Sequence, residues 1–214
     1  MVPSERFRSP DVTVTFPDPA GYDAIVAFGA IWAVYDDAAI GTWIHDEIAF
    51  TRAAMAAGVP VLGICFGGQV LAAAAGGRVE RAPQPEIGWT TIQTARPDLI
   101  EAGPWLEWHY DRVALPAGVP ALATTPLATQ AFTVGRALGV QFHPEVTESV
   151  LDAWLSYGGS DELARAGVDV DRLLSQTRSL ADGAARRAHE LVRRFVADVA
   201  TRPVGAPAST AARA

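Results

Sequence analysis

A buried strand that stops at the chain's only cysteine constrains this sequence more than any other stretch. Residues 59–64 are almost continuously apolar and lead directly into Cys65, a pattern that indicates a strand covered on both faces. A helix is predicted to follow at once, and Gly63 and Gly67 leave room for a sharp turn between the two elements. A cysteine on such a turn lies at the positive end of the helix, where a thiolate is favoured over a thiol. The stretch therefore predicts a nucleophile, with a buried structural cysteine as the alternative.

The size and charge of the chain exclude several classes of protein. With 214 residues, we expect one domain over residues 1–202 and a disordered tail rich in Ala, Pro and Ser over residues 203–214. A net charge of −7 argues against nucleic acid or an anionic membrane as the partner. A single cysteine excludes an intramolecular disulfide and suits a reducing compartment. With no secretory signal and no apolar run long enough to span a bilayer, the sequence predicts a cytoplasmic protein.

The first half of the chain reads as alternating strands and helices. Strands are expected at residues 11–16 and 22–29, and a helix capped by Asp37 is expected over residues 38–57. The strand at residues 59–64 comes next. A helix between two such strands indicates a parallel crossover unit and hence an α/β sheet.

The second half changes character. Short strand candidates separated by prolines and glycines favour a small antiparallel flap over one edge of the sheet; they lie at residues 78–81, 88–94, 121–123 and 131–134. A further strand is expected at residues 137–142. Helices are expected at residues 147–157, with Thr147 as a cap, and at 186–200, with Arg187 on the polar side opposite Leu191. The predicted class is a three-layer α/β fold with a mostly parallel sheet, flanking helices and an antiparallel flap.

Four histidines can serve as the base that a cysteine nucleophile needs. His189 lies among arginines on a helix. His45 is followed directly by Asp46 and Glu47, and three consecutive residues do not share one helical face, so a metal site is rejected. For His109, which follows Trp108, the sequence favours two interpretations equally: aromatic packing under the flap, or a place in the substrate pocket. His143 ends a buried strand, the position where open α/β sheets bind ligands.

Glu145 follows His143 at a spacing that allows its carboxylate to return to the imidazole. Pro144 stiffens the turn between them. A hydrogen bond from the imidazole to Glu145 would fix the tautomer and stabilise the imidazolium, as the third member of a triad does. The residues alone leave it open whether Cys65, His143 and Glu145 converge.

Two motifs resemble the signatures of class I, or triad-type, glutamine amidotransferases. They are Gly63-Ile-Cys-Phe-Gly-Gly-Gln69 and Gln141-Phe-His-Pro-Glu145, and they occur in the family's order. The resemblance runs from about residue 11 to residue 155 and is strongest for stand-alone members similar to the glutaminase domain of GMP synthase. Residues 87–89, 108–111 and 130–132 also resemble that subgroup.

The resemblance implies a reaction and three residues that perform it. Cys65 would attack the side-chain amide of glutamine, His143 would protonate the departing ammonia, and Glu145 would support His143. Water would then release glutamate from a γ-glutamyl thioester. No metal or cofactor is implied for this half-reaction.

The resemblance also implies how the substrate is held. The backbone N–H of Phe66 would supply one oxyanion contact and Ala30, in the loop after the second strand, the other. Gln69 would hold the amino-acid end of the substrate, and the backbone near Tyr110 and Asp111 would close the pocket.

Two departures from the family pattern affect these expectations. Ala30 and Ile31 stand where the family usually has Gly-Pro, and a Cβ at residue 30 conflicts with the loop only if its φ must be positive. Family members also begin with a strand and helix ahead of the strand expected at residues 11–16. A shortened start, a rearrangement or a strand from a partner is therefore expected, because an unfilled place would leave a buried strand edge unpaired.

The expected substrate is L-glutamine or a related γ-glutamyl amide. No P-loop or ATP-pyrophosphatase-like loop is seen, so ammonia is expected to pass to a separate synthetase subunit. The alternatives are a stand-alone γ-glutamyl-amide hydrolase and a catalytically silent binding or regulatory homologue. A cysteine peptidase is disfavoured by the motif at residues 141–145.

Overall fold

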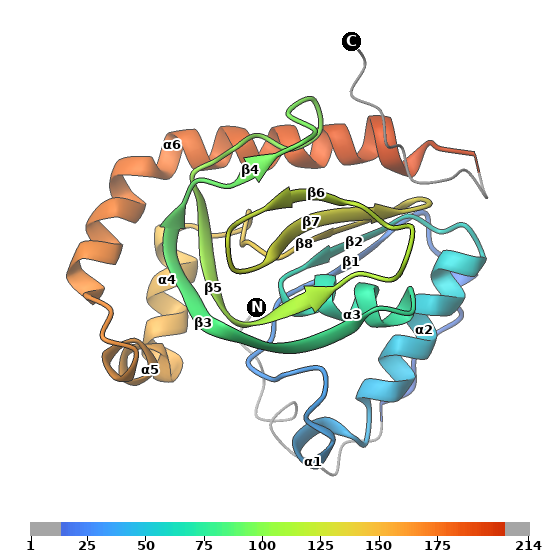
Figure 1. Ribbon diagram of the computed structural model, residues 1–214, viewed down its shortest axis with the longest axis horizontal. Coiled ribbons are helices and arrows are strands. Elements are labelled where there is room, and N and C mark those ends of the chain that lie inside the picture. Colours follow the sequence, from blue (N-terminus) through green and yellow to red (C-terminus); the bar gives the residue numbers. More distant parts are fainter. Residues whose placement is uncertain (1–13, 204–214) are drawn as a thin grey trace.

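The computed structural model describes residues 14–203 of the chain. Its strands are β1 (Ile25–Ala27), β2 (Val61–Ile64), β3 (Arg78–Thr90), β4 (Gln93–Thr94), β5 (Trp105–Ala114), β6 (Ala121–Thr124), β7 (Thr129–Val134) and β8 (Ala137–Val140). Six of them form one sheet in the order β1-β2-β8-β7-β6-β4, while β3 and β5 pair in a second sheet. Figure 1 shows this second sheet arching across the first.

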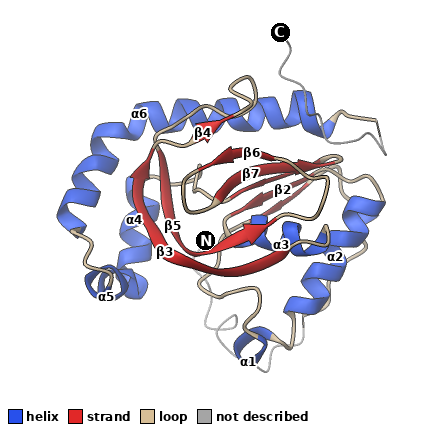
Figure 2. Ribbon diagram, in the orientation of Figure 1, coloured by secondary structure: helices blue, strands red, loops and turns tan. Residues whose placement is uncertain are grey.

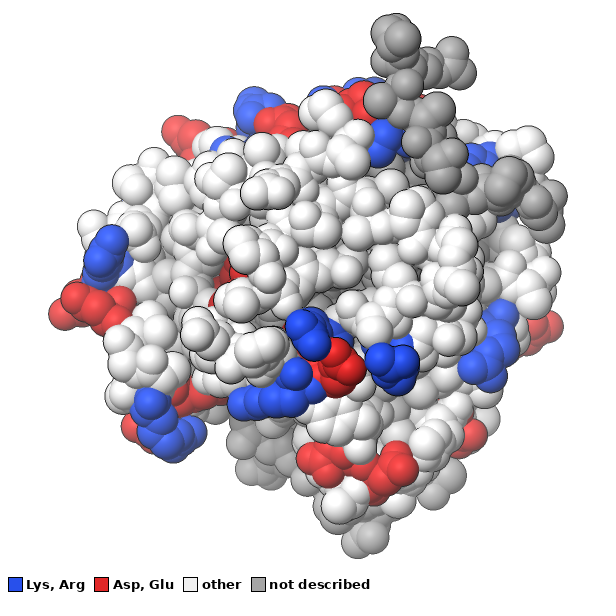
Figure 3. Space-filling model, in the orientation of Figure 1, with Lys and Arg blue, Asp and Glu red and all other residues white. Residues whose placement is uncertain are grey.

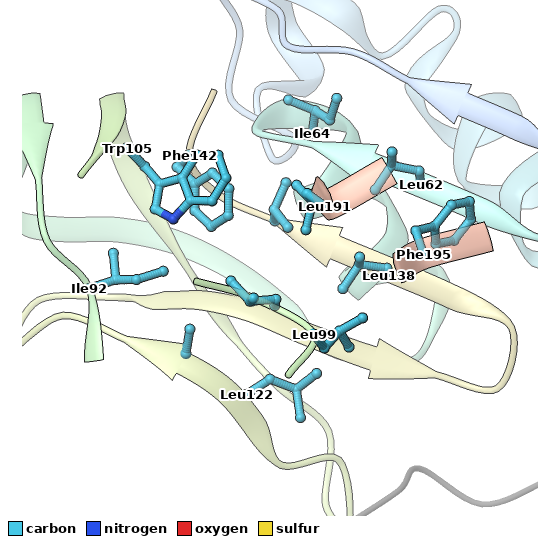
Figure 4. Packing of buried hydrophobic residues seen from close by; sticks show 14 of the residues in the cluster. Leu62, Ile64, Ile92, Leu99, Trp105, Leu122, Leu138, Phe142, Leu191 and Phe195 are labelled. Carbon is cyan, nitrogen blue, oxygen red and sulfur yellow. The ribbon is translucent and has the colours of Figure 1, made fainter. Parts of the chain in front are cut away.

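Helices cover both faces of the central sheet (Figure 2). Ala54 of α2 and Leu71 of α3 pack on one face, and Leu191 of α6 and Phe195 of η4 pack on the other, where Figure 4 shows them. The helices are η2 (Pro19–Gly21), α1 (Asp37–Ile40), α2 (Ile44–Ala56), α3 (Phe66–Ala74), α4 (Glu148–Trp154), η3 (Leu155–Gly159), α5 (Ser160–Arg165), α6 (Val170–Arg194) and η4 (Phe195–Ala200). None of the helices within residues 14–203 is both long enough and apolar enough to cross a membrane.

The expected three-layer α/β class is confirmed, with a refinement of the sheet. Only the pairs β1–β2 and β2–β8 are parallel, whereas β7, β6 and β4 join in antiparallel fashion, so the sheet is mixed. The parallel part is the part that carries Cys65 and His143 at its carboxyl end. The expected flap contains fewer strands than the sequence predicted. Strands β6 and β7 belong to the central sheet, and only β3 and β5 form the arch.

Strand β5 was not expected from the sequence. Its buried positions alternate as a strand's should, but Glu107, His109 and Asp111 occupy three of them. Polar residues on the buried face hide the period-2 pattern by which a strand is recognised. The same residues are the ones that bring ionisable groups to the site.

The amino-terminal elements differ from the sequence prediction. Residues 11–13 of the first expected strand lie outside the described part. Residues 14–16 form no strand, and Phe16 stacks on Phe50 of α2 with ring centroids 5.1 Å apart. The second strand is confined to β1. The long helix expected over residues 38–57 is broken at residues 41–43, and its cap is Asp36 rather than Asp37. The tail expected over residues 203–214 lies outside the described residues except for Pro203.

The carboxyl-terminal helices confirm one expectation and correct another. Thr147 caps α4 by accepting a hydrogen bond from the Val150 N–H at 3.2 Å. The last helix begins at Val170, well before the expected start. Arg187 was wrongly placed on its polar side. It lies four residues before Leu191 and so shares that buried face, where its guanidinium donates to the Pro104 carbonyl.

Candidate active site

Cys65 occupies a strained turn between β2 and α3. Its φ of 50° and ψ of −109° make it the sole non-glycine residue with a positive φ in the described part of the chain. Such a conformation costs about 1–3 kcal/mol and persists only where the surroundings enforce it. The Cys65 N–H donates to the Val140 carbonyl at 2.8 Å, and its carbonyl accepts the first helical bond from Gln69 at 3.0 Å. The turn is therefore fixed by a strand on one side and a helix on the other.

The glycines around Cys65 have the role that the sequence predicted. A Cβ on Gly63 would overlap the Gly67 carbonyl, and a Cβ on Gly67 would overlap the Ala27 carbonyl of β1. All of these atoms belong to the backbone, so they cannot move aside as a flexible side chain can. Neither position tolerates a larger residue while the elbow keeps its shape.

His143 is held in place at the end of the strand region that follows β8. Its backbone N–H donates to the Leu106 carbonyl of β5 at 2.8 Å. Its ring packs edge to face against Trp154 of α4, with centroids 4.9 Å apart. Nδ1 lies 2.7 Å from the Glu145 carboxylate, so the return of Glu145 expected from the sequence is what the structure has. This contact leaves Nε2 as the nitrogen that faces Cys65.

The charge on His143 follows from these neighbours. Burial alone would lower the pKa of His143, but the negative charges of Cys65 and Glu145 hold it well above its usual range. An imidazolium is thus favoured beside the sulfur. A charged donor at this point is what departure of an amine requires.

The loop after β1 lies against the same two side chains. A Cβ built on Gly29 would lie 3.0 Å from Cε1 of His143 and 3.5 Å from Cβ of Cys65. Ala30 follows with a φ that is not positive, so its Cβ causes no backbone conflict. The N–H of Phe66 is in the first turn of α3, where helical N–H groups have no partner within the helix. The loop at Gly29 and the first turn of α3 therefore both lie beside Cys65.

Three further residues were expected to bind the substrate. Gln69 is buried and donates its amide N–H to Gln141 at 3.2 Å, while its own carbonyl oxygen has no hydrogen-bond partner among the described residues. Tyr110 lies under the guanidinium of Arg81, 4.6 Å from ring centroid to Cζ. Asp111 is buried and accepts a hydrogen bond of 2.6 Å from the Tyr35 hydroxyl.

Sequence reasoning gave no role to several residues that the fold brings to the site. The Gln141 amide lies 3.6 Å from the sulfur of Cys65 as a donor, and Trp154 covers the His143 ring. Glu86 and Glu107 surround His109, which is buried in an ionic cluster and not in aromatic packing. The pattern Glu-x-His in β5 was the available signal, since two residues apart in a strand share a face.

The remaining histidines lie elsewhere. His45 forms an exposed ion pair with Asp37 at 3.0 Å, and His189 is exposed on α6. Within residues 14–203, no three His, Cys, Asp or Glu side chains are arranged to hold a metal ion. The outer face of the arch carries surface ion pairs of Glu80 with Arg78 and Arg112, in the region where Figure 3 shows charges of both signs side by side.

Comparison with known proteins places this arrangement in a family. A family model described as glutamine amidotransferase class-I matches residues 11–156. The chain belongs to the class I glutamine amidotransferase family. The matched span contains the elbow, the turn at His143 and the loop after β1, and it confirms the resemblance drawn from the two motifs.

Relatives of this class I glutamine amidotransferase are larger proteins. GMP synthase (glutamine-hydrolyzing) of Aeropyrum pernix is 38% identical over 148 residues, which are 63% of this chain and 28% of that protein. GMP synthase (glutamine-hydrolyzing) of Thiobacillus denitrificans is 35% identical over 158 residues, or 65% of this chain and 29% of that protein. The chain thus spans less than a third of the length of these relatives.

Solved structures share the fold. A glutamine amidotransferase from Thermotoga maritima superposes with a TM-score of 0.74 and 26% identity, covering 82% of this chain and 78% of the other. A glutamine amido transferase from Methylobacillus flagellatus has a TM-score of 0.76 at 24% identity, covering 88% and 82%, and supports the fold alone.

Proposed function

We propose that the chain hydrolyses the side-chain amide of glutamine, or of a related γ-glutamyl compound, and releases ammonia. One observation carries the proposal: Cys65 occupies a strained elbow beside a histidine whose second nitrogen is held by Glu145 at 2.7 Å. This constellation suits acyl transfer, because it combines a nucleophile atom, a proton carrier and a group that orients the carrier. Membership of the amidotransferase family supports an amide as the substrate.

The first half of the reaction forms a thioester. The Cys65 thiolate attacks the amide carbon, and the carbonyl oxygen becomes an oxyanion. His143 then gives the proton on Nε2 to the amide nitrogen, the C–N bond breaks, and ammonia departs. Glu145 keeps Nδ1 protonated throughout, which fixes the tautomer that this transfer requires.

The second half releases glutamate. His143, now neutral at Nε2, accepts a proton from water, and the resulting hydroxide attacks the thioester carbon. The C–S bond breaks and the sulfur returns as a thiolate beside an imidazolium. The raised pKa of His143 favours this resting charge pair.

The oxyanion is stabilised by the backbone N–H of Phe66 and by the loop that contains Ala30. A single donor of this kind is worth about 3 kcal/mol in related hydrolases. The position of Gly29 against both His143 and Cys65 supports a role for this loop, and the non-positive φ of Ala30 makes its Cβ compatible with that role. Gln69, Tyr110 and Asp111 are proposed to hold the amino-acid end of the substrate.

The ammonia is proposed to serve a separate synthetase subunit. The GMP synthases that the chain resembles are described as glutamine-hydrolyzing and are more than three times as long as the matched segment. A chain of this kind fits the amide-hydrolysing part of such a system.

The proposal is tested by measuring release of glutamate from L-glutamine by the purified full chain. Cys65→Ala and Cys65→Ser serve as inactive controls, and an electrophilic glutamine analogue is used to trap the nucleophile. Turnover that depends on Cys65 supports the proposal, and turnover without an added synthetase identifies a stand-alone hydrolase. A folded protein with neither turnover nor trapping at Cys65 is the silent homologue and contradicts it.

A further inference from the structure

Three ionisable side chains form a buried group beside Cys65 and His143, and the reaction above makes no use of them. Glu86 of β3 is 8% exposed, and Glu107 and His109 of β5 are 0% and 3% exposed. Nε2 of His109 lies 3.2 Å from the Glu107 carboxylate and 3.3 Å from the Glu86 carboxylate. Charged side chains are almost never fully buried unless they are paired, so the group is a built feature of the interior.

The surroundings of His109 make it a cation. Its Nδ1 lies 2.9 Å from the Asp111 carbonyl, which can accept a hydrogen bond but cannot donate one, and its Nε2 faces two carboxylates. Both ring nitrogens therefore carry hydrogen. Burial alone would lower the pKa of His109, but the contacts with Glu107 and Glu86 raise it to about 10.

The two carboxylates are held differently. Glu86 accepts hydrogen bonds of 3.0 Å from Gln130 and from Thr125, which fix it as an anchor. The oxygens of Glu107 have no hydrogen-bond partner among the described residues and meet only the ion-pair contact of His109. Burial raises the pKa of Glu107, and the positive charges of His109 and His143 act against this rise. Glu107 is thus the member of the group that responds to the charge on His143.

The group is coupled to the reacting pair on both sides. Leu106, next to Glu107 in β5, binds the backbone of His143 through its carbonyl at 2.8 Å. A negative Cys65 raises the pKa of His109, and a positive His143 lowers that of Glu107. Acidic and basic side chains therefore alternate from Cys65 to His143, Glu107 and His109. Alternating charges in a dry interior stabilise one another more than they do in water.

We propose that Glu107 and His109 are positioning residues that hold Cys65 and His143 as a thiolate–imidazolium couple, with Glu86 anchoring His109. The three side chains of the cluster are not arranged to bind a metal ion. This inference depends on the proposed function in one respect: it takes Cys65 and His143 as the reacting pair.

The charged groups that face each member come from several elements. Among the described residues, His109 faces Glu107 on its own strand, Glu86 from β3 and Cys65 from the elbow. Glu107 faces His109, Glu86 and His143. Since Glu107 is the acidic neighbour of His143 and His109 the basic neighbour of Cys65, the two substitutions are expected to disturb different halves of the couple.

The test reads the charge state of the couple without any substrate. We would measure iodoacetamide alkylation of Cys65 as a function of pH and the titration of His143 by ¹⁵N NMR in the full chain. His109→Gln is expected to slow alkylation at neutral pH about tenfold, and Glu107→Gln to lower the pKa of His143 by about one unit. The surface substitutions Glu80→Gln and His189→Gln are matched controls expected to change neither quantity.

A second variant keeps the test decisive if a single substitution prevents folding. Glu107→Leu combined with His109→Phe and Glu86→Gln removes all three ionisable groups together, an exchange that proteins often accept without loss of stability because no buried charge is left unpaired. It is expected to fold and to slow alkylation at least as much as His109→Gln.

The outcomes separate this inference from the proposed function. Folded variants with unchanged alkylation and an unchanged His143 titration would overturn the inference and leave amide hydrolysis standing. A native Cys65 that alkylates no faster than an ordinary thiol would overturn both. Normal thiolate formation with neither glutamine turnover nor trapping of Cys65 by the glutamine analogue would overturn amide hydrolysis alone.

Discussion

The two sides of the candidate active site are held in opposite ways. Cys65 and His143 are buried at the ends of the parallel strands, with backbone hydrogen bonds to β8 and β5. The facing loop, residues 28–35, lies at the edge of the sheet, and its Phe28 and Ile31 are 58% and 72% exposed. Cys65 and His143 thus belong to the core, whereas the loop that faces them belongs to the surface.

This difference teaches which substitutions the site tolerates. The elbow shares its atoms with the core, so a change there is expected to affect folding and activity together. The loop is fixed by fewer contacts, among them the packing of Val34 with Ile40 and the hydrogen bond from Tyr35 to Asp111. A change there is expected to affect activity and leave the fold intact.

The largest effect is expected from Gly67→Ala on the buried side. The added Cβ would overlap the Ala27 carbonyl, which as backbone of β1 has no room to withdraw. The free energy of unfolding is expected to fall by about 3 kcal/mol, as measured by urea denaturation. Gly21→Ala is the control, because no atom lies within 4 Å of its added Cβ. Native stability in Gly67→Ala would contradict the view that the elbow is fixed by the core.

Gly29→Ala should have the next largest effect, and on activity alone. Its Cβ would lie 3.0 Å from Cε1 of His143, so the ring must move by a few tenths of an ångström. Misplacement of a reacting group by up to about 1 Å costs about a hundredfold, and kcat/KM for glutamine is expected to fall by no more than this. Urea denaturation should give nearly native stability. A large loss of stability would show that the loop belongs to the core after all.

A smaller effect is expected from Tyr35→Phe, which removes the hydroxyl that binds Asp111 at 2.6 Å. Loss of one hydrogen bond of this type is worth about 1 kcal/mol, or about fivefold in an equilibrium constant. The change should appear as a higher KM with kcat preserved, because it loosens the loop without touching Cys65. A fall in kcat at unchanged KM would argue that the loop acts in the chemical step.

The smallest effect concerns alkaline pH. Burial and the hydrogen bond to Asp111 raise the pKa of Tyr35 from 10.0 to about 12. A raised pKa means that the folded state holds this proton more tightly, so the contribution to stability is complete below pH 10 and is lost as the pH rises toward 12. Because Tyr35 is half exposed, the contribution is expected to be under about 1 kcal/mol. Absorbance at 295 nm should show a late tyrosine ionisation that Tyr35→Phe removes.

Sequence reasoning succeeded where the signal was local. The elbow and the His143–Glu145 turn are each encoded within a few residues, and the geometry of each could be drawn from glycine, proline and spacing alone. The residues alone could not predict that the two turns meet, because this depends on β2 and β8 being neighbours in the sheet. Only the family resemblance implied that Cys65 and His143 lie together.

Reasoning failed where buried polar groups break the expected pattern. Glu107 and His109 at interior positions of β5 disguised a strand, and Arg187 on the buried face of α6 was assigned to the solvent side. In each case a partner distant in sequence stabilises the polar group: Glu86 for His109, and Pro104 for Arg187. Local patterns contain no information about such partners.

Strand β5 touches both sides of the site. The Leu106 carbonyl binds the backbone of His143, and the Asp111 carboxylate, five residues along, binds Tyr35 of the loop. In an extended strand these two points are about 17 Å apart. A displacement of the exposed loop at Tyr35 therefore acts on the same strand whose backbone holds His143.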